Sequence, residues 1–413
     1  MFNDLHDRLD ELAIFSGLYR NETFRAFQRL LAICGEQGIN WWQGKGEYYR
    51  FVRLLYNDHT TDWTSYLRDL VISVDTPCNW YAARNLSIPQ PMMASAQREL
   101  RYLSKMASIS SSVMKERYFI LGYGEMTGRE GLQPDWRAWE INLEMLWLER
   151  LRNIGRYGYG IYADYKMFHM ERSEDSDAGF VLEPVKYPDP VKLSDLVGYS
   201  LQRQQIIDNT KALLSGKNAA NVLLYGDAGT GKSATVKAIA NEFADEGLRL
   251  IELSKNELHL LPKLLDELSE NPLKFILFID DLSFQDNDDD FSALKAVLEG
   301  SISARSQNTA IYATSNRRHI VRETFSQRAG DEVHRNDTMQ ETISLSARFG
   351  IQLLFDKPNK DLYFEIVKSL AAQYGVTMSD EELSLEAERF ATRKSGRSAR
   401  AARQFVEQLA AKQ

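Results

Sequence analysis

The stretch GDAGTGKS at residues 226–233 decides the fold of this chain. It matches the pattern G-x-x-x-x-G-K-[ST] at every fixed position, namely Gly226, Gly231, Lys232 and Ser233. Glycines allow a tight bend whose backbone N–H groups surround a chain of phosphates, and the helix that follows directs its N-terminal N–H groups to the same place. The stretch therefore predicts a phosphate-binding loop for a nucleoside triphosphate, with ATP as the expected ligand.

The expected contacts extend one residue beyond the motif. The predicted nucleotide-binding residues of the loop are Gly226, Asp227, Ala228, Gly229, Thr230, Gly231, Lys232, Ser233 and Ala234. Within this set, Lys232 is expected to reach the β- and γ-phosphates, and the Ser233 hydroxyl to ligate Mg²⁺. The apolar run VLLYG (222–226) precedes the loop, and a helical pattern, SATVKAIANEFADEG (233–247), follows it. This order of strand, loop and helix is the context in which the motif binds phosphate.

A second element, FILFIDD (275–281), reads as a buried strand that ends in two acids. Ligands of open α/β sheets bind beyond the carboxyl ends of the strands, so the two acids are expected at the ligand edge. We expect Asp280 to hold Mg²⁺ through water, and Asp281 to polarise the attacking water molecule. The alternative is a strand that ends in a solvated acidic turn.

The fold class follows from the pattern around these motifs. Short β-rich apolar runs alternate with helical patterns, which indicates an α/β fold with a parallel sheet covered on both faces. These runs are NVLLYG (221–226), LRLIEL (248–253), KFILFID (274–280), TAIYATS (309–315) and IQLLF (351–355).

The chain divides into four predicted parts. Residues 1–172 read as a mainly α-helical N-terminal domain that holds all seven tryptophans; we expect these to pack in its core, with a binding face as the alternative. Residues 173–192 are rich in acids, glycine and proline and read as a linker. Residues 193–358 form the α/β core, and residues 359–413 form a C-terminal helical lid, in which Asn359 and Ser379 are expected to start helices.

Composition limits the classes of function. The net charge is −8, and residues 1–190 carry 22 Lys and Arg against 26 Asp and Glu, so neither half is a basic nucleic-acid-binding module. Two cysteines, Cys34 and Cys78, provide no disulfide framework or zinc motif and suit a reducing compartment. Because the N-terminus lacks a signal-peptide pattern and no apolar run approaches a membrane span, we expect a cytoplasmic protein.

Further polar residues fall at positions where a nucleotide site would use them. Asn316 ends the strand IYATSN and could position the water or sense loss of phosphate, and Arg348 precedes the next strand, where it could act on a neighbouring subunit's ATP. Arg400 begins a C-terminal helix and could contact the nucleotide, although Arg397 and Arg403 lie on adjacent turns. Val197 and Tyr199 precede the loop and could pack on adenine.

This order of motifs resembles the AAA+ ATPase superfamily over residues 190–413. More closely, the chain resembles the AAA+ proteins of domain-of-unknown-function family 815, through LLYGDAGTGKSATVKA, DDLSF, YATSNRRH, SLSARFG and GRSARAARQF. The resemblance implies a sheet of five parallel strands with the phosphate-loop strand central. It also implies a Mg²⁺-dependent ATP hydrolase that forms homo-oligomers, with Asn316 as first sensor, Arg348 as arginine finger and Arg400 as lid sensor.

Two departures from the superfamily pattern keep the function open. First, two aspartates, Asp280 and Asp281, stand where most of the superfamily has Asp-Glu, and in this the chain is similar to replication initiators and transposition helpers. Second, the segment SKNELHLLPKLL (254–265) lacks the aromatic residue and the glycine of the loop with which unfoldases thread a polypeptide. The main hypothesis is an oligomeric ATPase that remodels or switches a protein or nucleoprotein client through its N-terminal domain. One alternative is a nucleic-acid-associated helper of the helicase-loader or transposition type, supported by Arg317-Arg318-His319. The other is an ATP-dependent switch or scaffold without hydrolysis.

Overall fold

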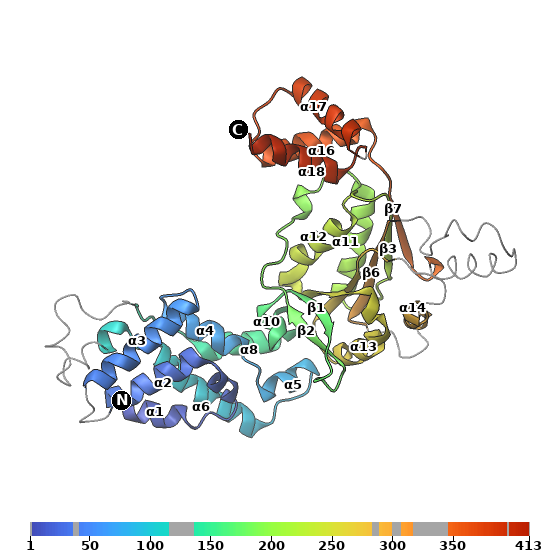
Figure 1. The fold of residues 1–413 in the computed structure, drawn as a ribbon. Coiled ribbons are helices and arrows are strands. Elements are labelled where there is room, and N and C mark those ends of the chain that lie inside the picture. The colour runs from blue at the N-terminus through green and yellow to red at the C-terminus, as the bar shows by residue number, and fades with distance from the viewer. Residues whose placement is uncertain are drawn as a thin grey trace. The chain divides into compact units, whose positions relative to one another are not determined.

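The computed structural model describes residues 2–35, 41–114, 136–282, 289–299, 307–316, 346–394 and 396–412. They belong to two units with separate cores, Met1–Asp164 and Tyr165–Gln413 (Figure 1). The described elements of the first unit are helical, as expected: α1 (Phe2–Leu9), η1 (Ser16–Arg20), α2 (Glu22–Gly35), α3 (Trp41–Asn57), α4 (Trp63–Ser73), α5 (Pro77–Ala83), α6 (Gln90–Ala107), α8 (Leu143–Arg152), α9 (Ile154–Tyr157) and α10 (Ile161–Asp164).

Aromatic side chains form the centre of the first unit. Phe27 of α2 stacks on Trp63 of α4 with ring centroids 4.2 Å apart, and Phe51 of α3 meets the edge of Trp63 at 5.3 Å. Trp136 packs against Phe51 at 5.6 Å and donates its indole N–H to the Ile109 carbonyl at 2.9 Å. Aromatic pairs of this kind add to the free energy gained by burying the rings.

Only some of the described tryptophans are in this core. Trp63, Trp136 and Trp147 are buried, whereas Trp80 is 49% exposed and Trp139 is 42% exposed. The expectation of core packing is therefore wrong for two of them. Helix α8 begins only at Leu143, because Asn142 caps it by accepting a hydrogen bond from the Met145 amide at 2.9 Å.

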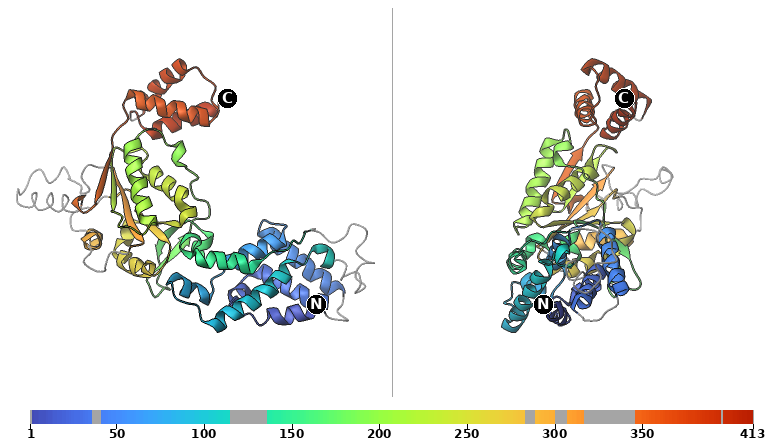
Figure 2. Two further views of the ribbon diagram at one scale, coloured as in Figure 1. Left: turned by 180° about the vertical axis from the view of Figure 1, so that it is seen from behind. Right: turned by 90° about the vertical axis from the view of Figure 1, so that its left-hand side faces the viewer.

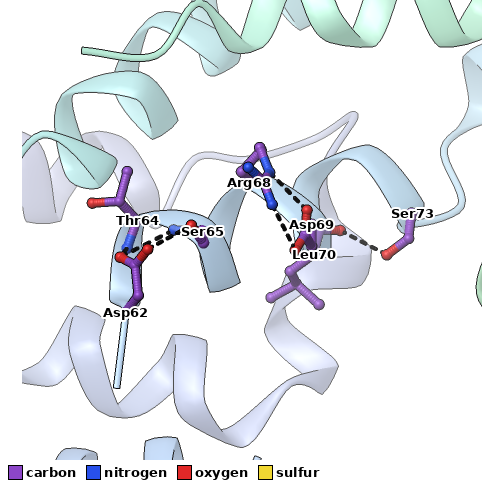
Figure 3. Close-up of polar contacts among 7 residues, drawn as sticks. All are labelled: Asp62, Thr64, Ser65, Arg68, Asp69, Leu70 and Ser73. Atoms are coloured by element: carbon purple, nitrogen blue, oxygen red, sulfur yellow. Dashed lines mark hydrogen bonds and ion pairs between the residues drawn. The ribbon is translucent and has the colours of Figure 1, made fainter. Parts of the chain in front are cut away.

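Helix α4 shows how local polar contacts fix an element of this unit. Asp62 caps it by accepting hydrogen bonds from the amides of Thr64 at 3.1 Å and Ser65 at 3.4 Å (Figure 3). In the middle of the helix, Arg68 donates two hydrogen bonds to Asp69, which raises the pKa of the Arg68 guanidinium. The cap satisfies amides that have no partner inside the helix, so it sets where α4 begins.

A buried carboxylate joins the N-terminal segment to α6. Glu99 is 1% exposed and accepts hydrogen bonds from three successive amides, those of Ala13 at 3.1 Å, Ile14 at 3.0 Å and Phe15 at 3.0 Å. Charge-assisted bonds from backbone amides stabilise a carboxylate that would otherwise be costly to bury. Burial, followed by the charge of Glu99, raises the pKa of the Cys78 thiol to about 11.

The second unit contains one sheet of seven strands in the order β2-β1-β4-β5-β6-β3-β7. The strands are β1 (Met167–Arg172), β2 (Phe180–Pro184), β3 (Val222–Gly226), β4 (Leu248–Leu253), β5 (Lys274–Ile279), β6 (Thr309–Ser315) and β7 (Ile351–Phe355). All five expected strands are present and pair in parallel, which confirms the α/β fold class. The phosphate-loop strand β3 is not central, because it lies between β6 and the edge strand β7.

Helices cover the sheet on both faces. The described helices of the core are η2 (Leu193–Asp195), α11 (Ser200–Leu214), α12 (Lys232–Phe243), η3 (Ala244–Glu246), η4 (Lys255–Leu260), α13 (Leu261–Ser269) and α14 (Asp289–Glu299). Helices α11 and α12 lie side by side in Figure 1 and share a core with Leu224 of β3 and Phe278 of β5. Helix α13 contacts β6, and Leu261, Leu264 and Leu268 of this helix are buried.

The sheet extends into the segment predicted as a linker. Strand β1 pairs in parallel with β4, and β2 returns antiparallel to β1. The acids and glycine of residues 173–179 form the turn between them, in which Ser173 donates to the Gly179 carbonyl at 3.0 Å. The predicted boundaries at 172 and 192 are therefore wrong: the first unit ends at Asp164, and the β1–β2 hairpin belongs to the α/β unit.

The C-terminal lid consists of three helices that pack together, as both views of Figure 2 show. They are α16 (Lys360–Gln373), α17 (Asp380–Arg393) and α18 (Ala399–Ala410). Asn359 caps α16, as expected, and Ser379 caps α17 by accepting a hydrogen bond from the Glu382 amide at 3.3 Å. Among the described residues, no helix of either unit combines the length and apolar character needed to cross a membrane.

We expect Glu99→Ala to lower the free energy of unfolding of the first unit by about 3 kcal/mol, because three buried amides lose their acceptor. Chemical denaturation followed by tryptophan fluorescence measures the change. Glu149→Ala is the matched control: Glu149 is exposed on α8 of the same unit, and its loss is expected to change stability by less than about 0.5 kcal/mol. Equal stability of the Glu99 variant and wild type would contradict the role of this carboxylate.

Candidate functional site

The strand order brings three chemically important segments to one edge of the sheet. Strand β6 pairs with β3 on one side and with β5 on the other, all in parallel. Their carboxyl ends therefore meet, which places the start of the loop at Gly226 beside Asp280 and Asn316. The sequence-predicted residues of three separate motifs thus belong to one site.

The loop glycines are required by close approach of the backbone. Gly226 has φ +129°, and a Cβ at this position would lie 2.3 Å from the Phe355 carbonyl oxygen of β7. Gly229 has φ +75°, and a Cβ there would lie 3.0 Å from the Cβ of Arg400. Both conformations favour glycine. The loop is therefore held between the end of β7 and the start of α18.

Lys232 lies at the centre of the site and is 5% exposed. Its Nζ donates hydrogen bonds to the carbonyls of Gly226 at 3.1 Å and Asp227 at 2.7 Å, and to Asn316 Oδ1 at 3.0 Å. Burial lowers the pKa of Lys232, while the carboxylates of Asp227, Asp280 and Asp281 act in the opposite direction. The ammonium group is thus fixed in place by three oxygen acceptors.

The expected metal ligands are in contact with each other. Ser233 Oγ donates a hydrogen bond to Asp280 Oδ1 at 2.6 Å. A hydroxyl and a carboxylate side by side are hard oxygen donors of the kind that Mg²⁺ binds together with substrate phosphates. These residues therefore fit Mg²⁺ in chemical type and in position next to Lys232.

Asn316 connects the lysine to the second acid. It accepts from Lys232 through Oδ1 and donates from Nδ2 to Asp281 Oδ1 at 2.7 Å. Asp281 has φ +53°, a left-handed conformation that is uncommon for a residue other than glycine. Asp281 and Asn316 are both exposed at the carboxyl edge. The predicted catalytic pair is thus assembled, with the amide group in direct contact with the carboxylate.

One residue of this edge was missed by the sequence reasoning. Thr314 of β6 is 2% exposed, and its Oγ1 donates to Asp280 Oδ1 at 2.5 Å and accepts from the Asp281 amide at 2.9 Å. A threonine in a β-rich run is indistinguishable by sequence from one that only favours the strand. The pairing of β5 with β6 is what brings its hydroxyl to the acids.

The predicted adenine-side residues lie between the loop and the lid. Tyr199 packs against Phe355 with ring centroids 4.9 Å apart, and its hydroxyl donates to the Asp356 carbonyl. Burial raises the pKa of Tyr199 to about 12, with the charges of Asp356 and Asp227 acting in the same direction. Val197 packs against the core of the lid. Tyr199 therefore lies close enough to the loop to interact with Asp227, and Val197 lies against the lid. Contact of either residue with adenine stays a prediction.

The structure separates the three lid arginines. The Arg400 amide donates to the Gly229 carbonyl at 3.1 Å, and the charge of Arg400 contributes to lowering the pKa of Lys232. Arg397 instead donates two hydrogen bonds to Glu388, at 3.1 and 2.6 Å. Arg403 is exposed on the next turn of α18. Arg400 is thus the lid arginine whose backbone contacts the loop.

Arg348 lies at the opposite edge of the sheet. It precedes β7, which pairs in parallel with β3 from Val222↔Ile351 to Gly226↔Phe355. The loop follows the carboxyl end of β3, whereas Arg348 precedes the amino end of β7, so about 16 Å of strand lies between them. Arg348 is therefore too far from the phosphate loop to be part of the candidate nucleotide site of its own chain. Its predicted action on a second subunit stays a prediction.

Comparison with known proteins agrees with this arrangement of strands and motifs. Residues 164–413 match the family model described as "Protein of unknown function (DUF815)". Among curated proteins, the chain is similar to chaperone protein ClpB 2 of Parasynechococcus marenigrum, with 28% identity over 244 residues, which is 52% of this chain and 24% of that protein. It is also similar to the replication factor C large subunit of Staphylothermus marinus, with 36% identity over 74 residues, or 18% of this chain and 16% of that protein.

These curated relatives are much longer than the regions matched, since the chain spans a quarter or less of each. Among solved structures, the RuvB Holliday junction branch migration motor of Thermotoga maritima has 18% sequence identity and a TM-score of 0.36. That match covers 53% of this chain and 63% of the RuvB chain. The family match, taken with the two curated relatives, supports an AAA+ P-loop ATPase, a class that binds nucleotide.

We expect Arg400→Ala to weaken nucleotide binding about tenfold, because a positive charge beside the loop is lost. Titration with a fluorescent ATP analogue measures the dissociation constant. Arg403→Ala removes the same charge from the exposed position one turn later and is expected to bind like wild type. If the Arg403 variant loses affinity and the Arg400 variant does not, the assignment of the lid arginine is wrong.

Proposed function

The chain belongs to the DUF815 protein family, and we propose that it is an oligomeric AAA+ ATPase that hydrolyses Mg-ATP to remodel or switch a client. The observation that carries this proposal is the connected set of hydrogen bonds from Lys232 through Asn316 to Asp281, beside the Ser233–Asp280 pair. These groups follow the carboxyl ends of β3, β5 and β6 and have the chemistry needed for phosphoryl transfer to water.

Each residue has a defined task in this proposal. The loop amides and Lys232 hold the β- and γ-phosphates, so Lys232 exchanges its carbonyl partners for phosphate oxygens when the nucleotide binds. Ser233 and Asp280 hold Mg²⁺, whose charge stabilises the negative charge that develops on the phosphate oxygens. Asp281 accepts a hydrogen bond from the attacking water, and Asn316 orients Asp281 through the amide contact already present.

Arg348 provides the reason to propose an oligomer. Its place at the amino edge of the sheet separates it from the phosphates of its own chain, as the pairing of β3 with β7 requires. A second copy that docks this edge against the nucleotide of the first would bring Arg348 to the γ-phosphate as an arginine finger. Hydrolysis would then change the angle between subunits, and the helical N-terminal unit would carry that change to a client.

The nucleic-acid-associated helper remains a second candidate, because of the segment that follows β4. Ser254 and Glu257 form a capping box that starts η4, in which Leu258 and Leu260 are buried. This segment is thus folded onto the core instead of presenting apolar residues for threading a polypeptide. Arg317-Arg318-His319, which the sequence reasoning associated with nucleic acid, lies outside the described residues. DNA that changes the rate of ATP turnover in a salt-dependent way would support the helper.

Phosphate release from Mg-ATP, measured over a range of protein concentrations, tests the main proposal. We expect turnover per subunit to rise with concentration, and Lys232→Ala and Arg348→Ala each to lower it by about 10³-fold or more. Lys217→Ala removes a positive charge just before β3, also at the amino edge, and is expected to behave like wild type. Tight ATP binding without turnover at any concentration would instead identify the non-hydrolysing switch.

Mixing the two inactive variants tests the shared site directly. A Lys232→Ala subunit still provides Arg348, and an Arg348→Ala subunit still provides an intact loop. In a randomly mixed assembly, about a quarter of the sites combine both intact parts, so the mixture is expected to regain activity. A mixture as inactive as its components would contradict an arginine finger supplied by a neighbouring subunit.

A further inference from the structure

Thr314 contacts the two acids and the residue that follows them. Its hydroxyl donates to Asp280 Oδ1 at 2.5 Å and accepts from the Asp281 amide at 2.9 Å. Its carbonyl accepts from the Leu282 amide at 2.7 Å. A single residue of the neighbouring strand thus makes hydrogen bonds to three consecutive residues after β5, which are Asp280, Asp281 and Leu282.

We propose that Thr314 is a positioning residue that aims Asp280 at the metal and holds Asp281 in its left-handed conformation. The inference rests on the proposed function, since it assigns Thr314 a role in binding Mg-ATP. Thr314 itself touches neither metal nor nucleotide in this proposal. It acts through the two carboxylate residues, and through Asp280 on the Ser233 hydroxyl that shares the same oxygen atom.

Each of the two hydrogen bonds of the Thr314 hydroxyl positions one of the two acids. A carboxylate is free to rotate about its terminal bonds, and the donated bond from Thr314 fixes the oxygen that also contacts Ser233. The accepted bond satisfies the Asp281 amide in a backbone conformation that is unfavourable for aspartate. That conformation places the Asp281 carboxylate against Asn316. A hydroxyl is needed because it donates and accepts at the same time.

Thr314 is buried, so solvent water does not replace its hydroxyl as the hydrogen-bond partner of the two acids. The side chain is 2% exposed, at the end of a strand paired on both sides. Bulk water does not reach the amide and carboxylate from that side. A valine has the shape of threonine but neither hydrogen bond, whereas a serine retains both. The backbone bond from Leu282 to the Thr314 carbonyl does not depend on the side chain, so the turn is expected to stay paired in every variant.

The experiment compares ATP binding in the presence of Mg²⁺ with binding in excess EDTA, for the 413-residue chain. We expect Mg²⁺ to strengthen binding to wild type, and Thr314→Val to lose about 10- to 100-fold of the affinity with Mg²⁺ present. Its affinity in EDTA is expected to match wild type, because the phosphate loop is unchanged. Thr314→Ser is expected to restore the effect of Mg²⁺. The kcat for ATP turnover, measured in parallel, is expected to fall in Thr314→Val and to recover in Thr314→Ser.

Two variants separate positioning from general damage. Thr309→Val makes the same exchange at the other end of β6 and is expected to leave both affinities unchanged. Thr314→Ala also removes the hydroxyl and replaces Thr314→Val if the valine variant does not fold, as judged by thermal unfolding without nucleotide. An unchanged effect of Mg²⁺ in the folded hydroxyl-free variant, or an equal loss in EDTA, would overturn the inference. Wild type that binds no ATP under either condition would reject the proposed function itself.

Discussion

The parallel pairing of β6 with both β3 and β5 is the constraint on which the site depends. Because all three strands run the same way, their carboxyl ends meet at one edge, and residues separated by up to 84 positions come within hydrogen-bond distance. Lys232 then reaches Asn316, and Ser233 reaches Asp280. With a different strand order, the same residues would be present in the chain, but Lys232 would not contact Asn316 and Ser233 would not contact Asp280.

The same edge is closed by the end of β7, by the chain that follows it and by the start of α18. The Phe355 carbonyl approaches Gly226, the Lys357 amide donates to Asp227 Oδ2 at 3.1 Å, and the Arg400 amide donates to Gly229. These contacts link the loop to the chain that enters the lid and to the lid's last helix. The lid is therefore in direct contact with the loop that we propose to hold the phosphates.

The region before the core is more closely connected to it than its composition indicated. The β1–β2 hairpin extends the sheet beyond β4, and Asn241 of α12 donates to the carbonyls of Asp189 and Val191 at 2.8 and 2.9 Å. The segment that follows the hairpin is thus attached to the helix that begins at Lys232. Composition indicated a linker because turn residues and prolines dominate it, while strands of five or six residues with partly exposed faces give a weak pattern.

The sequence by itself determined the phosphate loop, the acids after β5, the five core strands and the helical lid, since each is encoded by neighbouring residues with a distinct period or spacing. It did not determine which of Arg397, Arg400 and Arg403 adjoins the loop, because three arginines on successive turns look alike until their partners are known. Nor did it reveal Thr314 or Glu99, which are ordinary residues of a strand and a helix. Their roles depend on partners brought near by tertiary packing: the acids of β5 for Thr314, and the amides of residues 13–15 for Glu99. Local sequence fixes which groups a segment offers, and only the packed structure decides which of them meet.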